Sequence, residues 1–190
     1  QGFREVLRQA APLVRPWVPV VSLTKGLERD SGKRMTEVVA DELSGHPAAV
    51  LTGPNLAKEI MDGQPAASVV AIDDDVIARE LQRIFSNPRL LVYTNPDVIG
   101  CEIAGALKNV MAIAAGIAHG LGYGDNTKAA LITRGLAELA RLGVALGGDP
   151  LTFSGLAGMG DLVATCTSDQ SRNRTVGVAL GRGRSLDEVV

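Results

Sequence analysis

The stretch NPDVIGCEIAGALKN, residues 95–109, is where the pattern of this chain changes. Asn95 can cap a helix, Pro96 suits the first helical position, and Asp97 complements the positive end of the helix dipole. The residues that follow are mostly apolar or small, which favours one long helix over 98–120. Helical patterns continue over 127–146, around 162 and over 171–180. The sequence therefore predicts an all-α part from residue 96 onward.

Upstream of this stretch, helical and extended patterns alternate along the chain. Apolar periodicity predicts helices over 3–14, 33–43, 55–61 and 76–85. Short apolar runs predict strands over 18–23, 48–51, 67–72 and 90–93, the first of them buried on both faces. Strands separated by helices indicate an α/β sheet that is at least partly parallel. We place the boundary between the α/β part and the all-α part near residue 96.

Lys108 is the residue of the opening stretch whose charge needs an explanation. Three and four positions away lie only Ala104, Gly105, Met111 and Ala112, so its own helix supplies no carboxylate to neutralise it. A buried ammonium without a partner tends to lose its proton, which makes Lys108 a candidate proton-transfer group. The alternative is an ion pair with a carboxylate on another helix.

The neighbours of Lys108 on its helical stripe are all small: Cys101, Gly105, Ala112 and Ala115. They leave room beside the ammonium for another helix or for a substrate. Glu102 and Asn109 share a neighbouring stripe and could orient one another or a ligand.

Composition restricts the class of protein. The net charge of −2 and the pI near 5.7 give no reason to expect nucleic acid as a partner. Cys101 and Cys166 have no metal-ligand or redox spacing, so we expect no metal and two reduced thiols, as in a cytoplasm. Residues 98–121 are apolar enough to suggest a membrane span, but the charges within them favour a buried helix of a soluble protein.

Two junctions that follow strands carry candidate binding groups. Lys25 stands in SLTKGLE, residues 22–28, directly after a strand, where side chains of an open α/β sheet point into the ligand crevice. Its alternative is a solvated loop lysine. In GPN, residues 53–55, Gly53 lets a ligand approach the backbone, and Asn55 begins a helix whose free N–H groups favour an anion. The alternative there is ordinary turn and cap chemistry.

Two segments of the helical part add polar groups. The glycine-rich turn GLAGMGDL, residues 155–162, opens onto a helix with Asp161 near its start, where an N-cap is the alternative role. TCTSDQSRNR, residues 165–174, concentrates hydroxyls, an amide and two guanidiniums at a helix start, which favours an anion site. A solvated basic helix start is the alternative.

Taken together and in order, these segments resemble NAD(P)-dependent glycerol-3-phosphate dehydrogenase of the bacterial type. The resemblance rests on SLTKGLE at 22–28, GPNLA at 53–57, EIAGALKN at 102–109, DNTKAALITRG at 125–135, GLAGMGDL at 155–162 and SRNR at 171–174. It covers nearly the whole chain. Six segments in register are specific, whereas any one alone would be weak.

The resemblance implies a fold and an activity. Residues 1–95 would be the second part of a Rossmann-like dinucleotide-binding domain, and residues 96–190 an all-helical substrate and catalytic domain. The family interconverts sn-glycerol 3-phosphate and dihydroxyacetone phosphate by hydride exchange with NAD or NADP, which feeds glycerophospholipid synthesis.

The resemblance also implies residue roles. Lys108 would be the catalytic proton donor or acceptor at the carbinol oxygen. The substrate would be bound by Lys25, Gly53, Asn55, Lys108, Asn109, Asp161, Thr165, Ser171, Arg172 and Asn173, the last three holding the phosphate. The cofactor would be bordered by Lys25, Ala57 and Arg172.

Three departures accompany the resemblance. Both the N-terminal Gly-x-Gly-x-x-Gly loop and the C-terminal tail of the family are missing, so the chain is expected to be truncated at both ends relative to the family. The missing N-terminal segment also leaves the preference for NAD or NADP unreadable. Many bacterial members have Ser-Phe where this chain has Asn55-Leu56.

Two alternative functions remain open: a related hydroxy-acid dehydrogenase, and a non-catalytic binding or assembly module. The apolar helices could pack internally or as a homodimer.

Overall fold

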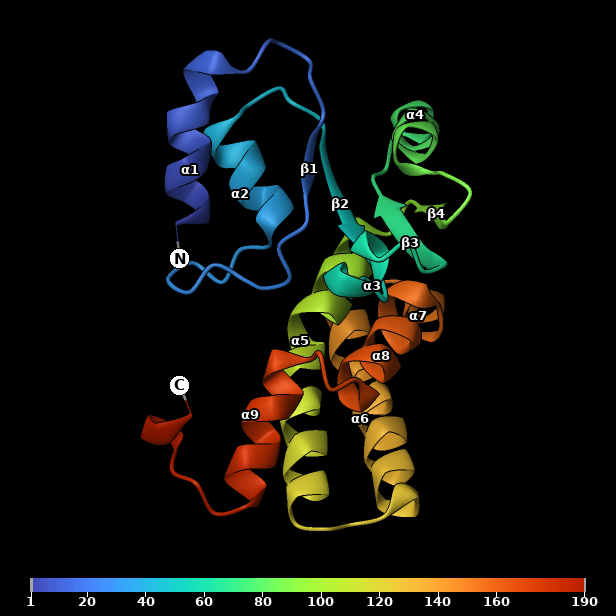
Figure 1. The fold of residues 1–190 in the computed structure, drawn as a ribbon. Helices are drawn as coiled ribbons and strands as arrows, with labels where there is room; N and C mark the ends of the chain where they lie inside the picture. The colour runs from blue at the N-terminus through green and yellow to red at the C-terminus, as the bar shows by residue number, and fades with distance from the viewer. Residues whose placement is uncertain (1, 190) are drawn as a thin grey trace.

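The computed structural model describes residues 2–189 as an α/β part followed by a helical part (Figure 1). This order confirms the predicted fold class. The α/β elements are α1 (Phe3–Ala10), η1 (Ala11–Leu13), β1 (Val20–Ser22), α2 (Met35–Glu42), β2 (Ala48–Thr52), α3 (Ala57–Met61), β3 (Ala66–Ala71), α4 (Asp75–Phe85) and β4 (Leu90–Asn95). The helical elements are α5 (Val98–Gly120), α6 (Asp125–Ala145), α7 (Pro150–Ser154), η2 (Leu156–Gly160), α8 (Asp161–Thr167), α9 (Arg172–Gly181) and η3 (Leu186–Glu188).

The sheet is mixed and has the strand order β1-β2-β3-β4. β1 runs parallel to β2, with Val20 opposite Ala48. β2 and β3 are antiparallel, and β3 and β4 are parallel again. The prediction of an at least partly parallel sheet is confirmed.

The central strands are buried on both faces, as their continuous apolar runs predict. On one face, Leu51 and Val70 pack with Leu81 of α4. On the other, Val50 and Val69 pack with Cys101 of α5 and with Ala157 of η2. The sheet therefore fixes where the first turns of α5 lie.

Strand β1 differs from its prediction. It covers only Val20–Ser22, and Val18 and Leu23 are 38% and 64% exposed. Among the residues described, β1 is an edge strand that pairs only with β2, over Val20–Ser22. The apolar run is therefore longer than the paired segment that defines the strand. On the same side, α1 packs against α2 through Leu7, Val38 and Val39 (Figure 1).

The boundary at residues 95–97 is also corrected. Asp97, not Asn95, caps α5, because its side chain accepts a hydrogen bond from the Gly100 amide. Asn95 instead ends β4, where it pairs with Ala71. Two further starts shift: α3 begins at Ala57, so Asn55 does not begin a helix, and α6 begins at Asp125 rather than residue 127. The division into two domains at residue 96 stays a prediction.

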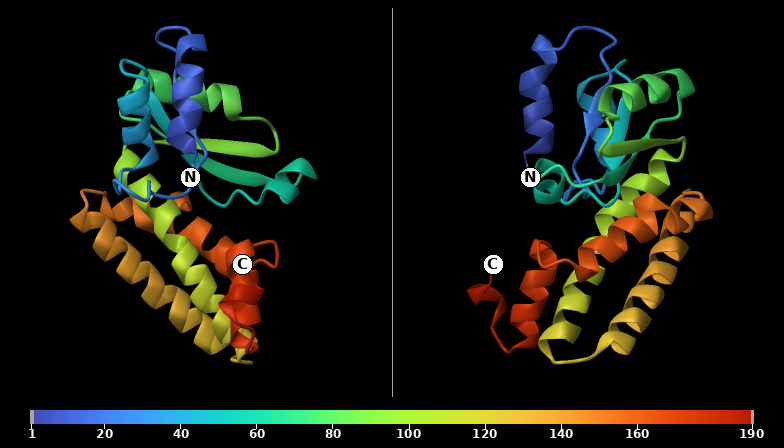
Figure 2. Two further views of the ribbon diagram at one scale, coloured as in Figure 1. Left: turned by 90° about the vertical axis from the view of Figure 1, so that its left-hand side faces the viewer. Right: turned by 45° about the vertical axis from the view of Figure 1, so that its right-hand side comes forward.

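Helices α5 and α9 pack backbone against backbone. Figure 2 shows α5 leaving the sheet and running the length of the helical part, with α9 beside its second half. A Cβ atom added to Gly177 would lie 2.1 Å from the Ile113 carbonyl oxygen, and one added to Gly116 would lie 2.2 Å from the Arg174 carbonyl oxygen. Gly120 and Gly181 repeat this arrangement one turn along. Glycine is therefore required at each of these four positions.

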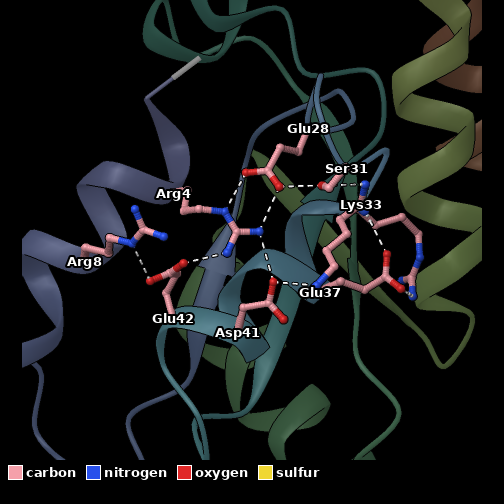
Figure 3. Close-up of polar contacts among 9 residues, drawn as sticks. Arg4, Arg8, Glu28, Ser31, Lys33, Glu37, Asp41 and Glu42 are labelled. Atoms are coloured by element: carbon pink, nitrogen blue, oxygen red, sulfur yellow. Dashed lines mark hydrogen bonds and ion pairs between the residues drawn. The ribbon is translucent and has the colours of Figure 1, made fainter.

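An ion-pair network ties α1 to α2 and to the loop after β1 (Figure 3). Arg4 donates to Glu28 over 2.7 and 2.8 Å, and to Glu42 and Asp41 over 2.5 and 3.0 Å. The hydrogen bonds that Glu28 accepts, first from Arg4 and then from Ser31, lower the pKa of its carboxyl to about 2. The pKa values of Asp41 and Glu42 are lowered as well.

Candidate active site

The site is a buried cluster in which two lysines share one aspartate. Asp161, the first residue of α8, is 1% exposed. Its Oδ1 accepts a hydrogen bond from Lys108 Nζ, and its Oδ2 accepts one from Lys25 Nζ at 2.6 Å. Asp161 therefore acts as the common partner of both ammonium groups and not as a helix cap.

Lys108 reaches this cluster from the buried stripe of α5. It is 6% exposed, and the stripe residues Cys101, Gly105, Ala112 and Ala115 are buried with it. Its Nζ also donates to Thr165 Oγ1 at 2.7 Å. An ammonium has three donors, so these two contacts leave one for a ligand. The ion pair weighed as the alternative role of Lys108 is present, and it belongs to a larger cluster.

The electrostatics of Lys108 favour a proton-transfer role. Burial lowers its pKa to about 8, against the opposing attraction of Asp161 and with a further lowering from Lys25. The second lysine is what distinguishes this cluster from a simple ion pair. Two ammonium groups and one carboxylate leave one excess positive charge, which attracts an anionic ligand.

Lys25 comes from the loop after β1, as the strand–loop junction predicts. Its Nζ also donates to the Gly53 carbonyl oxygen at 2.9 Å, which joins the loops that follow β1 and β2. Gly53 has φ +115°, and an added Cβ there would lie 3.4 Å from Ser68 Cα. Both the dihedral angle and the close backbone explain the glycine.

The third group of predicted residues lies at the start of α9. Asn173 donates from Nδ2 to Asn109 Oδ1 at 2.9 Å, so α9 begins beside the residue that follows Lys108. Ser171 is the N-cap of α9 and accepts from the Arg174 amide. Arg172 is exposed, and its guanidinium has no polar partner within residues 2–189. The helix start thus presents an exposed cation one residue before Asn173, which contacts the neighbour of Lys108.

Two expectations about the site need correction. Asn55 precedes α3 and its Oδ1 accepts from Ser68 Oγ at 2.6 Å, so it supplies no helix N-terminus. Glu102 and Asn109 do not contact one another, because Glu102 binds Arg34 and Thr36 on the α2 side. Ala57, expected beside the cofactor, is an exposed residue at the start of α3, and its role stays a prediction.

Sequence reasoning missed the Thr52 hydroxyl. It is buried at the end of β2 and has no hydrogen-bond partner within residues 2–189. It faces Gly105, since a Cβ added there would lie 3.3 Å from Thr52 Oγ1 and 3.5 Å from Lys25 Cγ. A polar residue at the end of an apolar strand, directly before Gly53, is the signal that could have revealed it.

Metal binding, thiol reactivity and membrane insertion can each be examined in the part of the chain that the structure describes. Within residues 2–189 no group of His, Cys, Asp and Glu side chains is arranged to hold a metal ion. Burial raises the pKa of Cys101 to about 12 and that of Cys166 to about 11. In this part of the chain α5 alone has the length and hydropathy of a membrane span, but half of that window is buried. We interpret α5 as a core helix.

This combination of an α/β sheet and a helical part, with a charged cluster where they meet, is typical of dehydrogenases that pair a dinucleotide-binding domain with a helical domain. Residues 1–78 match the family described as NAD-dependent glycerol-3-phosphate dehydrogenase N-terminus, and residues 97–190 match its C-terminus. The chain belongs to the NAD-dependent glycerol-3-phosphate dehydrogenase family.

Individual relatives agree with this assignment. The chain is 62% identical over 189 residues to glycerol-3-phosphate dehydrogenase [NAD(P)+] 2 of Sphingopyxis alaskensis, and 54% identical to the enzyme of Mycobacterium avium. These matches cover all of this chain but 57% and 55% of the relatives. The crystal structure of the Coxiella burnetii enzyme has a TM-score of 0.94 at 45% identity, over 99% of this chain and 57% of that one.

Proposed function

We propose that this chain forms the greater part of the catalytic site of an enzyme that interconverts sn-glycerol 3-phosphate and dihydroxyacetone phosphate with NAD or NADP. The observation that carries the proposal is the sharing of Asp161 by Lys25 and Lys108. Family membership supports the same reaction. Because the chain spans 57% of the Sphingopyxis relative, the activity is proposed for the protein that contains it.

Lys108 is proposed as the acid and base at the reacting oxygen. With a pKa of about 8, its amine can both give and take a proton near neutral pH. In reduction, the ammonium stabilises negative charge that develops on the carbonyl oxygen and then donates its proton to that oxygen. Asp161 and Thr165 hold the amine in place throughout, since they accept two of its three N–H groups.

The residues of this chain could accommodate one end of the nicotinamide cofactor. A cavity of about 670 Å³ lies beside Lys25 and is lined by Phe3, Arg4, Lys25, Glu28, Met35 and their neighbours. The unpartnered Thr52 hydroxyl and the backbone at Gly53 lie near the same lysine. No glycine-rich dinucleotide loop is present in the sequence, so these residues would border only one end of the cofactor. When bound, the cofactor supplies or accepts the hydride.

The start of α9 is proposed to hold the phosphate of the substrate. Ser171, Arg172 and Asn173 combine a hydroxyl, a free guanidinium and an amide with the amides of the first helical turn. The contact between Asn173 and Asn109 places this group near Lys108. Binding energy from the phosphate would orient the carbon chain at the lysine.

Turnover and binding test this function separately. Lys108→Met is expected to lower kcat for glycerol 3-phosphate by roughly a thousandfold. The matched control is Lys128→Met, because Lys128 forms an ion pair on α6 with the exposed Asp125. Calorimetric titration of the chain with dihydroxyacetone phosphate tests binding without turnover. Near-normal kcat in Lys108→Met would refute the role of the amine, and a panel of 2-hydroxy acids would reveal the other class of substrate.

We further propose a cytoplasmic enzyme whose product supplies glycerophospholipid synthesis. The two buried, unpaired cysteines support a reducing compartment. A homodimer remains a prediction, supported by the exposed apolar residues Leu142, Val144 and Leu146 near the end of α6.

A further inference from the structure

Glu102 is a buried carboxylate that the proposed reaction does not use. It lies in the second turn of α5 and is 5% exposed. Its oxygens accept hydrogen bonds from Arg34 Nη1 at 2.9 Å, from the Thr36 amide at 2.9 Å and from Thr36 Oγ1 at 2.5 Å. The Thr36 amide is one of the first amides of α2, which have no acceptor within their own helix. Glu102 therefore caps α2 from a different element.

Arg34 closes the loop that carries Lys25. Residues 23–34 connect β1 to α2, and Arg34 pairs across this loop with Leu27, two residues after Lys25. The Glu28 amide donates to the Lys33 carbonyl oxygen at 2.8 Å, which holds the same turn. A contact that fixes Arg34 and Thr36 thus also fixes the segment around Lys25.

Helix α5 meets this loop at three successive positions spaced three residues apart. Glu102 binds the start of α2, the bare backbone of Gly105 accommodates the Lys25 stem, and Lys108 shares Asp161 with Lys25. A spacing of 1.5 Å per residue puts Glu102 and Lys108 roughly 9 Å apart along the axis. The helix sets one register for all three contacts.

We propose that Glu102 is a positioning residue that holds the loop 23–34 in register on α5, so that Lys25 and Lys108 both reach Asp161. Its importance for turnover rests on the proposed function, but the positioning itself concerns only residues of this chain. The geometry at this buried carboxylate is strict, because two of its three donors are the backbone amide and the short side chain of Thr36, and the third is a charged guanidinium.

The proposal predicts a specific electrostatic change at Lys108. The groups that face its amine are Asp161, Thr165 and Cys166 from α8 and Lys25 from the loop. Lys25 lowers the pKa of Lys108, whereas Asp161 raises it. If the loop shifts, the repulsion from Lys25 weakens while Asp161, fixed on α8, stays. The pKa of Lys108 should then rise.

The test is a titration of the lysine side chains by NMR in the 190-residue chain labelled with ¹³C at Cε. The chain has five lysines, and Lys108→Met assigns the resonance of interest. In Glu102→Gln the titration midpoint of Lys108 is expected to rise by about one pH unit, the scale on which neighbouring charges shift lysine pKa values. The matched control is Glu80→Gln, because Glu80 is a half-exposed helical carboxylate that pairs with an arginine of its own helix, Arg83 on α4. It should leave the midpoint unchanged.

A second variant keeps the test decisive if Glu102→Gln fails to fold. Arg34→Gln removes the charged donor from a side chain that is 19% exposed, and it should raise the midpoint in the same direction. An unchanged or lower midpoint in a folded variant, or an equal rise in Glu80→Gln, would overturn the proposal. A merely structural role would lower the urea midpoint of unfolding without moving the Lys108 titration. Because this readout needs no turnover, it is independent of the outcome for the proposed reaction.

Discussion

Replacing Gly177 by alanine tests whether backbone contact between α5 and α9 determines the stability of the helical part. In an isolated helix this change would be favourable by about 1 kcal/mol, because alanine has the higher helix propensity. In this protein the added Cβ would lie 2.1 Å from the Ile113 carbonyl oxygen and 2.9 Å from Gly116 Cα. Both neighbours are backbone atoms, so no side-chain rotation can relieve the contact.

The expected magnitude follows from these distances. The helices must separate by roughly 1 Å, which removes a quarter to a half of the dispersion energy along their contact. Overpacking of this kind costs about 1–3 kcal/mol, and the rigid neighbour places Gly177→Ala at or beyond the upper end. After the gain in propensity is subtracted, we expect a net loss of about 2 kcal/mol in the free energy of unfolding. This corresponds to a decrease of roughly 4–8 °C in Tm for a chain of this size.

Urea unfolding of the wild-type and variant chains measures this loss. The midpoint should fall while the m value stays constant, since the surface exposed on unfolding changes little. Gly26→Ala is the control, because no atom lies within 4 Å of the added Cβ and the glycine has no positive φ. A Gly177→Ala midpoint equal to or above that of the wild type would show that helix propensity outweighs the contact.

Three further predictions concern other parts of the chain. Arg172→Ala should weaken binding of dihydroxyacetone phosphate at least tenfold while leaving unphosphorylated dihydroxyacetone unaffected, and equal losses in calorimetry would contradict a phosphate role. Trp17→Gly should stabilise the chain by about 0.5–1 kcal/mol, because Trp17 is 78% exposed and has φ +67°; a lower Tm would show that its side chain matters more than its backbone. The Arg4 network contributes stability above the ordinary Glu28 pKa of 4.5 and loses it as the pH falls toward about 2, so the difference in Tm between wild type and Arg4→Met should vanish over that window.

Local sequence patterns predicted most of the elements and failed where tertiary pairing decided between equal local signals. The runs behind α4 and α5 are long and periodic, and both helices lie where they were predicted. Asn95 and Asp97 are comparable N-caps, but the pairing of Asn95 with Ala71 extends β4 and leaves the cap to Asp97. No pattern within residues 90–97 could have predicted that Asn95 pairs with Ala71.

In the candidate site, too, local patterns identified single residues but not their distant partners. Lys108 could be singled out from its own helix, since no carboxylate lies within reach on that helix. Its partner Asp161 lies 53 residues away, and Lys25 lies 136 residues from that aspartate. Only the order of the matched segments related them before the structure did. The partners of Glu102 lie 66 and 68 residues upstream, and no segment pointed to them.

The sharing of Asp161 has a consequence for how the molecule is made. Lys25 lies in the loop after the first strand described, whereas Asp161 belongs to α8, a helix near the other end of the chain. Contacts between such distant residues form only after long loops have closed, so they belong to the late, slow steps of folding. During synthesis, 136 further residues must be added after Lys25 before Asp161 is present. A nascent chain in which α8 has not yet been made therefore lacks the shared contact of Lys25 and Lys108 with Asp161.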